Sequence, residues 1–150
     1  MANESKPGFK GKVTLGANTV LGMGTWSWSG LNRDLLEDTE FSDEADDYIY
    51  SLLRCGTISF SGNYKKDDTT GQDVLRAALL NQTEITDIRF YVDSVSYFTP
   101  NNTTGAGGGI PAEFPVGHVK IVSLDVDLDK AALGTISFSV QLCKSPMRLI

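Results

Sequence analysis

The chain has 150 residues, a formal net charge of −6 and an isoelectric point near 4.6. Such a length fits one domain, residues 1–150, which can bury roughly 70% of its unfolded surface without a disulfide or a metal. The acidity argues against a protein that grips nucleic acid through its phosphates, because that contact requires a basic face.

The N-terminal segment 1–12 is polar, and its charged residues are Glu4, Lys6, Lys10 and Lys12. It therefore lacks the apolar run of a signal peptide, and nowhere does an apolar stretch reach the length that spans a membrane. These features predict a protein of the cytosol that does not insert into membranes. The two cysteines, Cys55 and Cys143, match no CxxC spacing, which favours free thiols.

Residues 13–29 alternate apolar and small polar side chains around Gly22 and Gly24, a pattern typical of a pair of strands. Trp26 and Trp28 fall on one face of the second strand. Two neighbouring indoles on a strand favour packing in a core or an interface over a platform that stacks on sugars.

The segment from Arg33 to Tyr48 is strongly acidic. Its acidic residues are Asp34, Glu37, Asp38, Glu40, Asp43, Glu44, Asp46 and Asp47. Loops of this length are uncommon in a compact domain and tend to be functional, and Leu35, Leu36 and Phe41 supply apolar side chains for docking. We therefore expect a long acidic docking loop. Metal binding or glycosidase carboxylates are the alternative, although nothing in the sequence fixes their geometry.

Residues 56–64 predict a strand with one apolar face and one hydroxyl-lined face, the latter carrying Ser59 and Ser61. After a turn at Lys65 to Asp68, a helix is expected over Thr70 to Asn81. Its one apolar stripe requires that it cover an opening in a β-sheet core, since a short amphipathic helix is unstable alone in water.

The expected helix has both of its faces and both of its ends specified by sequence. Its inward stripe is formed by Val74, Leu75, Ala78 and Leu79, and its outward residues are Gln72, Asp73 and Arg76. Thr70 is expected to cap the start together with Asp73, in a variant of the capping box. Asn81 is expected to provide the left-handed residue at the end.

Residues 88–100 alternate again and predict further strands, whereas 101–115 are rich in glycine and proline and predict a mobile loop. This loop lacks the Lys-Ser/Thr and the strand-to-helix setting of a phosphate-binding loop. His118 has no motif-bearing nucleophile beside it, so a structural role is expected.

The alternation is strict from Val122 to Asp129. Val122, Leu124, Val126 and Leu128 are expected to face the core, which directs Asp125, Asp127 and Asp129 to the opposite, wet face. A calcium loop is excluded because Lys130 and Ile136 replace the turn glycine and the bidentate glutamate. The hexapeptide of residues 56–61 recurs at residues 134–139, which places Ser137 and Ser139 on a second hydroxyl-lined face and suggests equivalent positions in one sheet.

These segments, in order, resemble the tail tube proteins of long-tailed bacteriophages. The resemblance rests on Asn32 to Phe41, Gly56 to Tyr64, Thr70-Gly71-Gln72 and Ile88 to Val92, and it covers nearly the whole chain. It implies a mainly β, single-domain β-sandwich or barrel-like fold with one flanking helix. It also implies rings of six subunits whose inner sheets join into one barrel, and rings stacked into a hollow tube.

The family further implies an extended loop that bridges subunits and rings, which this chain would carry in its acidic segment. The residues expected in that inter-subunit loop are Asp34, Leu35, Leu36, Glu37, Asp38, Glu40, Phe41, Asp43 and Glu44. Its acids are expected to dock near Lys6, Lys10 and Lys12 or near Lys65 and Lys66 of an adjacent subunit.

Other implied partners are a tape measure protein and tail terminator or tip proteins, with DNA passing through without specific binding. The implied location is the virion tail, assembled in the host bacterial cytoplasm, with no cofactor and no enzymatic activity.

An acidic lumen would let DNA slide without sticking, so we expect the channel to be lined by some of the polar strand residues. The candidates are Asp125, Asp127, Asp129, Ser59, Ser61, Ser137 and Ser139. Three alternatives remain open at this point. They are a tube protein of the type VI secretion kind, a monomeric ligand-binding β-sandwich with a pocket built from Trp26, Trp28 and the glycine loop, and a hydrolase built on the acidic loop.

Overall fold

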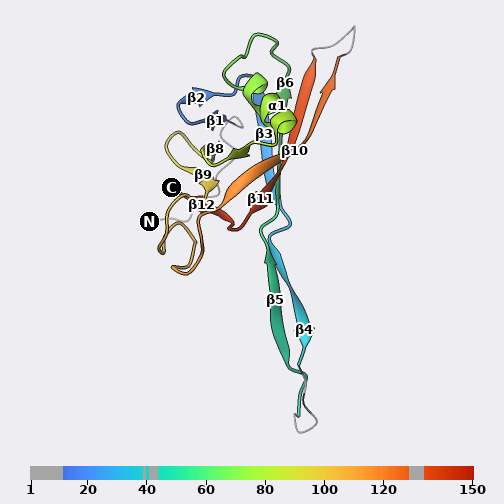
Figure 1. Ribbon diagram of the computed structural model, residues 1–150, viewed down its shortest axis with the longest axis vertical. Helices are drawn as coiled ribbons and strands as arrows, with labels where there is room; N and C mark the ends of the chain where they lie inside the picture. Colours follow the sequence, from blue (N-terminus) through green and yellow to red (C-terminus); the bar gives the residue numbers. More distant parts are fainter. Residues whose placement is uncertain (1–11, 39, 41–43, 129–133) are drawn as a thin grey trace.

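The structure is a computed structural model that describes residues 12–38, 40, 44–128 and 134–150 (Figure 1). Its helix and strands are β1 (Val13–Leu15), β2 (Asn18–Thr19), β3 (Met23–Ser29), β4 (Asn32–Glu37), β5 (Tyr48–Arg54), β6 (Thr57–Asn63), α1 (Gln72–Asn81), β7 (Glu84–Ile85), β8 (Ile88–Tyr91), β9 (Tyr97–Pro100), β10 (His118–Asp127), β11 (Thr135–Cys143) and β12 (Met147–Leu149).

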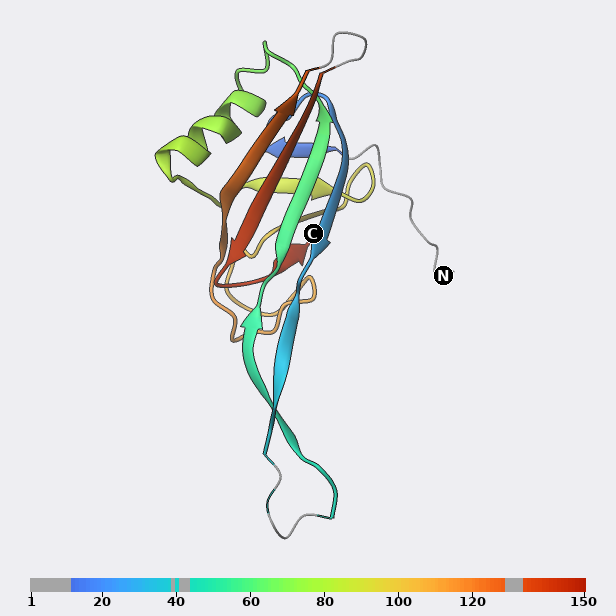
Figure 2. The same cartoon turned by 90° about the vertical axis from the view of Figure 1, so that its right-hand side faces the viewer.

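The strands form two five-stranded sheets and one separate hairpin. The small sheet has the order β12-β9-β8-β1-β2, and the long sheet has the order β3-β6-β11-β10-β7. Strands β4 and β5 form a two-stranded ribbon that extends far from the rest of the molecule, and we name it the arm (Figures 1 and 2). The prediction of a mainly β sandwich with one flanking helix is confirmed.

One detail of the strand pairing differs from the expectation. Residues 13–29 form three strands instead of two, because β1 pairs with β2 and with β8 in the small sheet while β3 pairs with β6 in the long one. Gly22 makes this change of sheet possible, since it has a φ of +77° and a Cβ there would lie 2.3 Å from the Asn63 carbonyl oxygen.

The core lies between the two sheets and is built on the repeated hexapeptide. The two copies run side by side in β6 and β11, with Phe60 directly opposite Phe138. Their rings are stacked at a centroid distance of 5.1 Å, and Phe90 of the small sheet meets Phe60 at 5.4 Å. All three phenylalanines are essentially inaccessible to water. The repeat therefore supplies the centre of the core through its apolar face.

The two tryptophans extend this core toward the edge of the long sheet, as expected. Trp26 packs against Phe90 and Phe98 and donates its indole N–H to the Tyr91 carbonyl at 3.0 Å. Trp28 packs against Phe98 and donates to the Cys55 carbonyl at 3.0 Å. Both indole N–H groups are therefore hydrogen-bonded within the fold.

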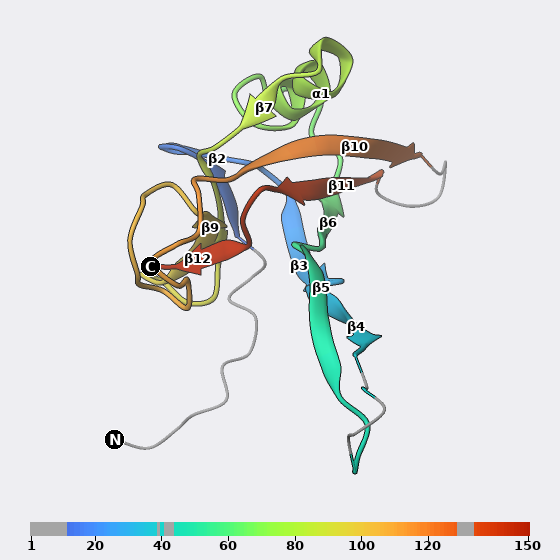
Figure 3. The same cartoon turned by 60° about the horizontal axis from the view of Figure 1, so that its bottom comes forward.

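Helix α1 lies beside β10 and covers the edge of the core (Figures 2 and 3). Leu75 and Ala78 are buried as expected, with Leu75 fully inaccessible. Two assignments are wrong, because Val74 is 43% exposed and Gln72 is only 2% exposed. The buried stripe therefore runs through Gln72, Leu75 and Ala78, one step around the helix from the expected one.

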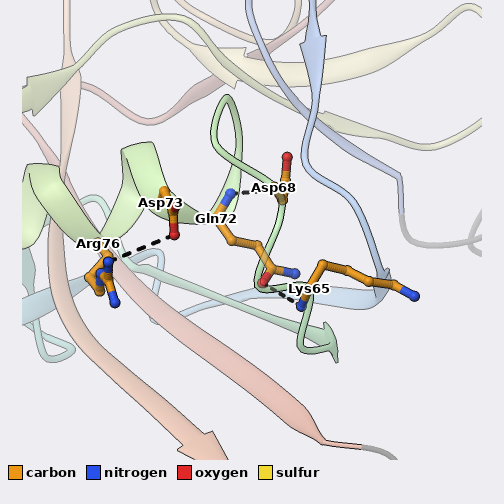
Figure 4. A network of polar contacts seen from close by, with 5 residues as sticks. All are labelled: Lys65, Asp68, Gln72, Asp73 and Arg76. Atoms are coloured by element: carbon orange, nitrogen blue, oxygen red, sulfur yellow. Dashed lines mark hydrogen bonds and ion pairs between the residues drawn. The ribbon is translucent and has the colours of Figure 1, made fainter.

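Gln72 is buried because it joins three segments of chain (Figure 4). Its amide nitrogen donates to the carbonyls of Leu21 at 2.8 Å and Asn63 at 3.0 Å, and its amide oxygen accepts from Lys65 N at 3.0 Å. Asp68 accepts from the backbone N–H groups of Gln72 at 3.0 Å and Leu21 at 2.9 Å. This network fixes the start of α1 against the ends of β3 and β6.

The two ends of the helix are therefore built differently from the prediction. Thr70 makes no side-chain cap, and the Asp68 carboxylate takes that role from outside the helix. The left-handed residue after the helix is Gln82, with a φ of 58°, and not Asn81. Gln82 donates its backbone N–H to the Ala78 carbonyl, which closes the last turn.

The glycine-rich segment 101–115 contains no long helix or strand, but it is tied to the C-terminal strand. Arg148 donates to the Asn101 side chain at 2.9 Å and to the Gly105 carbonyl at 2.6 Å. Asn101 is fully buried and donates to the Pro115 carbonyl at 2.8 Å. The absence of regular structure is as expected, these bonds tie both ends of the segment to the fold, and its mobility stays a prediction.

We predict that Leu75→Asp lowers the free energy of unfolding by several kcal/mol, because it places a charge at a fully buried position facing the sheet. Val74→Asp is the matched control on the same helix and should change stability by about 0.5 kcal/mol or less. Urea denaturation followed by circular dichroism measures both. Equal effects of the two substitutions, or a spectrum dominated by helix, would contradict the observed packing of α1.

Candidate functional site: a polar sheet face and a hairpin arm

One face of the long sheet carries only polar side chains over most of its area. Residues directly opposite each other on neighbouring strands point to the same face, so the register defines successive rows across the sheet. The two central rows of this polar face are Thr25, Ser61, Ser137 and Asp125, and then Ser27, Ser59, Ser139 and Ser123. The opposite face carries Trp26, Phe60, Phe138 and Leu124, which pack toward the small sheet.

The structure thus brings together residues that were singled out separately in the sequence. Ser59 and Ser61 of β6, Ser137 and Ser139 of β11, and Asp125 and Asp127 of β10 all lie on the polar face. Asp129 lies outside the described residues. Sequence reasoning missed the contribution of β3, whose Thr25 and Ser27 complete the rows. The alternation of small hydroxyl residues with the two tryptophans was the signal for it.

The expected alternation from Val122 onward is interrupted by a bulge. The register of β10 shifts between Ile121 and Ser123, so that Val122 is an extra residue and is 56% exposed. Leu124 is half-buried, but Val126 and Leu128 are 44% and 69% exposed, because the ends of β10 and β11 extend beyond the small sheet (Figure 1). The expectation that all four apolar residues face the core is therefore wrong.

Charge is unevenly distributed over the polar face. Asp125 and Asp127 are exposed near one end, opposite Ser137 and Thr135. Toward the other end, Lys120 lies opposite Gln141, and its Nζ is 3.9 Å from Glu84 Oε1. The described part of this face is therefore acidic at one end and mainly hydroxyl-lined elsewhere, instead of uniformly negative.

Both long edges of this sheet are free over most of their length. Strand β3 is the terminal strand on one side, and on the other side the two-residue β7 pairs with β10 only at Val119 and Lys120. The rest of β10 presents unpaired backbone groups. Free edges of this length are templates for pairing with another strand.

The acidic segment begins in a β-strand, β4, and continues into the connection that joins β4 to β5 in a hairpin. Strands β4 and β5 pair through Leu35 with Tyr50 and Leu36 with Ile49. Of the predicted docking residues, Asp34, Leu35, Leu36 and Glu37 lie in β4, while Asp38, Glu40 and Glu44 follow it toward the turn. Phe41 and Asp43 lie outside the described residues. Asp34 is bound by Arg54 at 2.9 Å, an exposed pair that contributes at most about 1 kcal/mol.

The arm exposes an unusual amount of apolar surface. Its exposed large hydrophobic residues are Leu35, Leu36, Tyr48, Ile49, Tyr50 and Leu52. Sequence reasoning missed those from Tyr48 onward, although a run rich in tyrosine, isoleucine and leucine is itself a strand signal. An isolated hairpin is marginally stable in water, and apolar patches of this kind mark interaction sites. These two properties are typical of a segment that docks on another surface.

The cysteines and the histidine form no reactive group. Both cysteines are free thiols, as expected, and burial raises the pKa of the Cys55 thiol, with nearby Cys143 adding to the shift. A raised thiol pKa suppresses the reactive thiolate. The mostly buried His118 lies 3.5 Å from Glu84 through its Nε2. Over the described ranges, no group of three or more His, Cys, Asp or Glu residues is arranged to hold a metal ion.

No family model matches the sequence, and no curated protein matches it. Solved structures nevertheless match the fold. The tail of an empty gene transfer agent particle, with C6 symmetry, matches with a TM-score of 0.67 at 11% identity, over 97% of this chain and 99% of that chain. The chain has the fold of a tail tube protein.

Two further structures share this tail-tube fold. The sheath–tube complex of an extracellular contractile injection system, PVC, matches with a TM-score of 0.64 at 9% identity, over 99% of this chain and 93% of that one. The tube-terminating cap of the anti-feeding prophage matches with a TM-score of 0.56 at 12% identity, over 100% and 93%. The resemblance noted in the sequence is confirmed for the fold.

We predict that substitutions at two adjacent residues of β11 change the stability of the tail-tube fold by very different amounts. Phe138→Ala should lower the free energy of unfolding by about 3–5 kcal/mol, since it removes half of the stacked pair. Ser139→Val should change it by about 0.5 kcal/mol or less, because the polar face is uncovered in the monomer. Chemical denaturation of the two variants measures the difference. A large decrease in the free energy of unfolding for Ser139→Val would mean that the polar face is covered within the single chain.

Proposed function

We propose that this chain is the structural, non-enzymatic subunit of a phage-like tail tube, in which rings of six copies stack into a hollow conduit for DNA. The observation that carries this proposal is the long sheet, which is apolar and covered on one face, polar and bare on the other, and free at both edges. A sheet with these properties is suited to be one segment of a channel wall.

The strand directions allow such segments to join. Consecutive strands β3, β6, β11 and β10 are all antiparallel to their neighbours. Because these four strands alternate in direction, β10 of one copy and β3 of the next run antiparallel when the copies stand side by side, beyond the short stretch of β10 that pairs with β7. Pairing these edges would continue the antiparallel arrangement from one copy to the next. Around a full ring the sheet would close into a barrel, which has no exposed edges.

This arrangement fixes which face borders the channel. The small sheet lies over one face of the long sheet (Figure 3), so in the proposed ring it and α1 would form the outer layer and the polar face would border the channel. The channel would then be lined by Ser59, Ser61, Ser137, Ser139, Asp125 and Asp127. The C6 symmetry of the gene transfer agent tail supports six copies in each ring.

The wall would favour sliding over binding. A basic surface binds DNA non-specifically with Kd values of about 10⁻⁴–10⁻⁶ M, and repeated binding of that strength would hold a passing strand. A wall of hydroxyl groups, with the carboxylates of Asp125 and Asp127 repeated around the ring, offers no such attraction. We propose that DNA passes without specific binding and that the subunit needs no cofactor.

The partners follow from the same proposal. The matched structures include a tube-terminating cap and a sheath/tube terminator, which supports terminator proteins as partners at the tube ends, with a tape measure protein inside during assembly. The location would be the virion tail, built in the host bacterial cytoplasm. Within the described ranges, no helix combines the length and the apolar character needed to cross a bilayer.

An injection-system tube that carries a different cargo is the second candidate, and the matched contractile injection systems favour it over the others. A ligand-binding sandwich is disfavoured because the indole N–H groups of Trp26 and Trp28 bind backbone carbonyls and their rings are packed. A hydrolase on the acidic segment is disfavoured because that segment forms an extended arm.

We predict that the purified, concentrated protein forms rings or tubes in electron micrographs, whereas a variant lacking residues 35–45 stays a folded monomer. The reason is that the deletion removes Leu35, Leu36 and the acidic turn of the arm while leaving both sheets intact. Circular dichroism controls for folding. Tubes formed normally by the deletion variant would contradict the role of the arm, and a wild-type protein that stays monomeric would contradict the tube.

We predict that replacing Asp125, Asp127 and Asp129 by lysine leaves tubes assembled but slows genome delivery, because the introduced ammonium groups attract the DNA phosphates. Higher salt should relieve the defect, since counterions screen that attraction. The same positions changed to asparagine are the control and should deliver near the normal rate. Normal delivery by the lysine variant would remove the channel assignment of these residues.

A further inference from the structure

Residues 92–96 connect β8 to β9, and we name them the β8–β9 turn. Val95 at its tip is 75% exposed. The Asp93 carboxylate accepts from the backbone N–H groups of Val95 at 2.8 Å and Ser96 at 2.7 Å. The backbone N–H of Val92 donates to the Ser96 carbonyl at 3.0 Å. An apolar side chain that is held in place before contact loses little conformational entropy on binding.

A groove lies between α1 and β10, and we name it the α1–β10 groove. It has a volume of about 400 Å³, and its lining residues are Ala78, Leu79, Gln82, Thr83, Lys120 and Ile121. Ala78 and Ile121 are buried, with exposed fractions of 6% and 8%, whereas Gln82 and Thr83 are exposed. A hollow of this size with an apolar floor and a polar rim is suited to receive an aliphatic side chain.

The turn and the groove lie at opposite edges of the long sheet, because β8 crosses the width of that sheet (Figure 2). Strand β8 begins beside β10, since β7, which pairs with β10, comes just before it in the chain. It ends at the edge strand β3, where the Tyr91 carbonyl accepts from the Trp26 indole N–H at 3.0 Å. The groove includes Gln82 and Thr83, just before β7, and the turn follows Tyr91. The two features therefore lie at the same level, one at each end of β8.

Copies that stand side by side would bring these features together. In the proposed ring, the β3 edge, where the turn lies, meets the β10 edge of the next copy, where the groove lies. The turn belongs to the small sheet and the groove borders α1, so their contact would lie in the outer layer and leave the pairing of β3 with β10 undisturbed. Asp93 on the turn and Lys120 at the groove carry opposite charges, which favours this orientation.

We propose that the β8–β9 turn of each copy docks in the α1–β10 groove of the next copy, with Val95 against Ala78, Leu79 and Ile121. This inference rests on the proposed tube, and it adds a contact between side chains to the pairing of strand edges. Paired strands can slip by two residues without a change of face, whereas a side chain fits a groove at one position. The docked turn would therefore fix the register of β3 on the β10 of its neighbour.

The first test compares two side chains of similar exposure. Val95→Ser should raise the critical concentration for ring and tube formation by about tenfold, because burial of a valine corresponds to a factor of that order in an association constant. Leu80→Ser is the matched control and should leave it unchanged, since Leu80 is 74% exposed but does not line the groove. Light scattering and electron microscopy measure the onset. An unchanged value for Val95→Ser, or an equal increase for both variants, would overturn the docking.

The second test fills the groove. Thr83→Trp should raise the critical concentration as Val95→Ser does, because the indole would occupy the space that Val95 needs. Combining the two substitutions should add little to either one, since each alone removes the same contact. Circular dichroism verifies that the variants fold. Effects that multiply in the combined variant would overturn the docking.

Photo-crosslinking identifies the segment that the turn contacts. A photo-reactive residue at position 95 should capture residues within 78–83 or 120–121 of another copy and yield a ladder of up to six linked chains, the number in the proposed ring. Capture of any other segment, or of its own chain alone, would overturn the docking while leaving the tube intact. Failure of the unmodified protein to form rings or tubes would instead refute the proposed function, and the docking with it.

Discussion

The first physical constraint is the alternation of apolar and small polar residues along β3, β6 and β11. It places Phe60 in contact with Phe138 and Phe90 on one side of the long sheet, and directs serine and threonine hydroxyls to the other side. The small sheet is needed to cover the first face, and nothing in the described chain covers the second. A sheet that packs into the core on one face and contacts water on the other is suited to the proposed channel wall.

The second constraint is that the chain buries its apolar surface incompletely. The arm and the distal part of β10 both expose aliphatic side chains, and they lie at opposite ends of the molecule (Figure 1). A stable monomer has no use for such a distribution, because each exposed patch favours association. In the proposed assembly, if rings repeat along the long axis, each of these patches would become a contact between copies.

Much of the fold could be predicted from the sequence, and the predictions that were wrong have local physical causes. Period-two alternation gave the strands and the hydroxyl faces, and the apolar spacing located the helix. A glutamine on a helix is usually exposed, whereas Gln72 is buried because it bonds to Leu21 and Asn63, which are distant in sequence. The bulge at Val122 cannot be predicted from a strictly alternating pattern. Strand β4 cannot be recognised from its sequence because acidic residues interrupt its apolar ones, although the acids that follow it do lie in a connecting segment.

A cryo-electron microscopy reconstruction of the assembled wild-type protein, at a resolution that shows side chains, would reveal whether the polar face of the long sheet borders the channel. We expect Ser61, Ser137 and Asp125 on the inner wall, with β3 of each subunit paired to β10 of its neighbour. A reconstruction in which the small sheet borders the channel, or in which the polar face lies against another subunit, would refute this assignment.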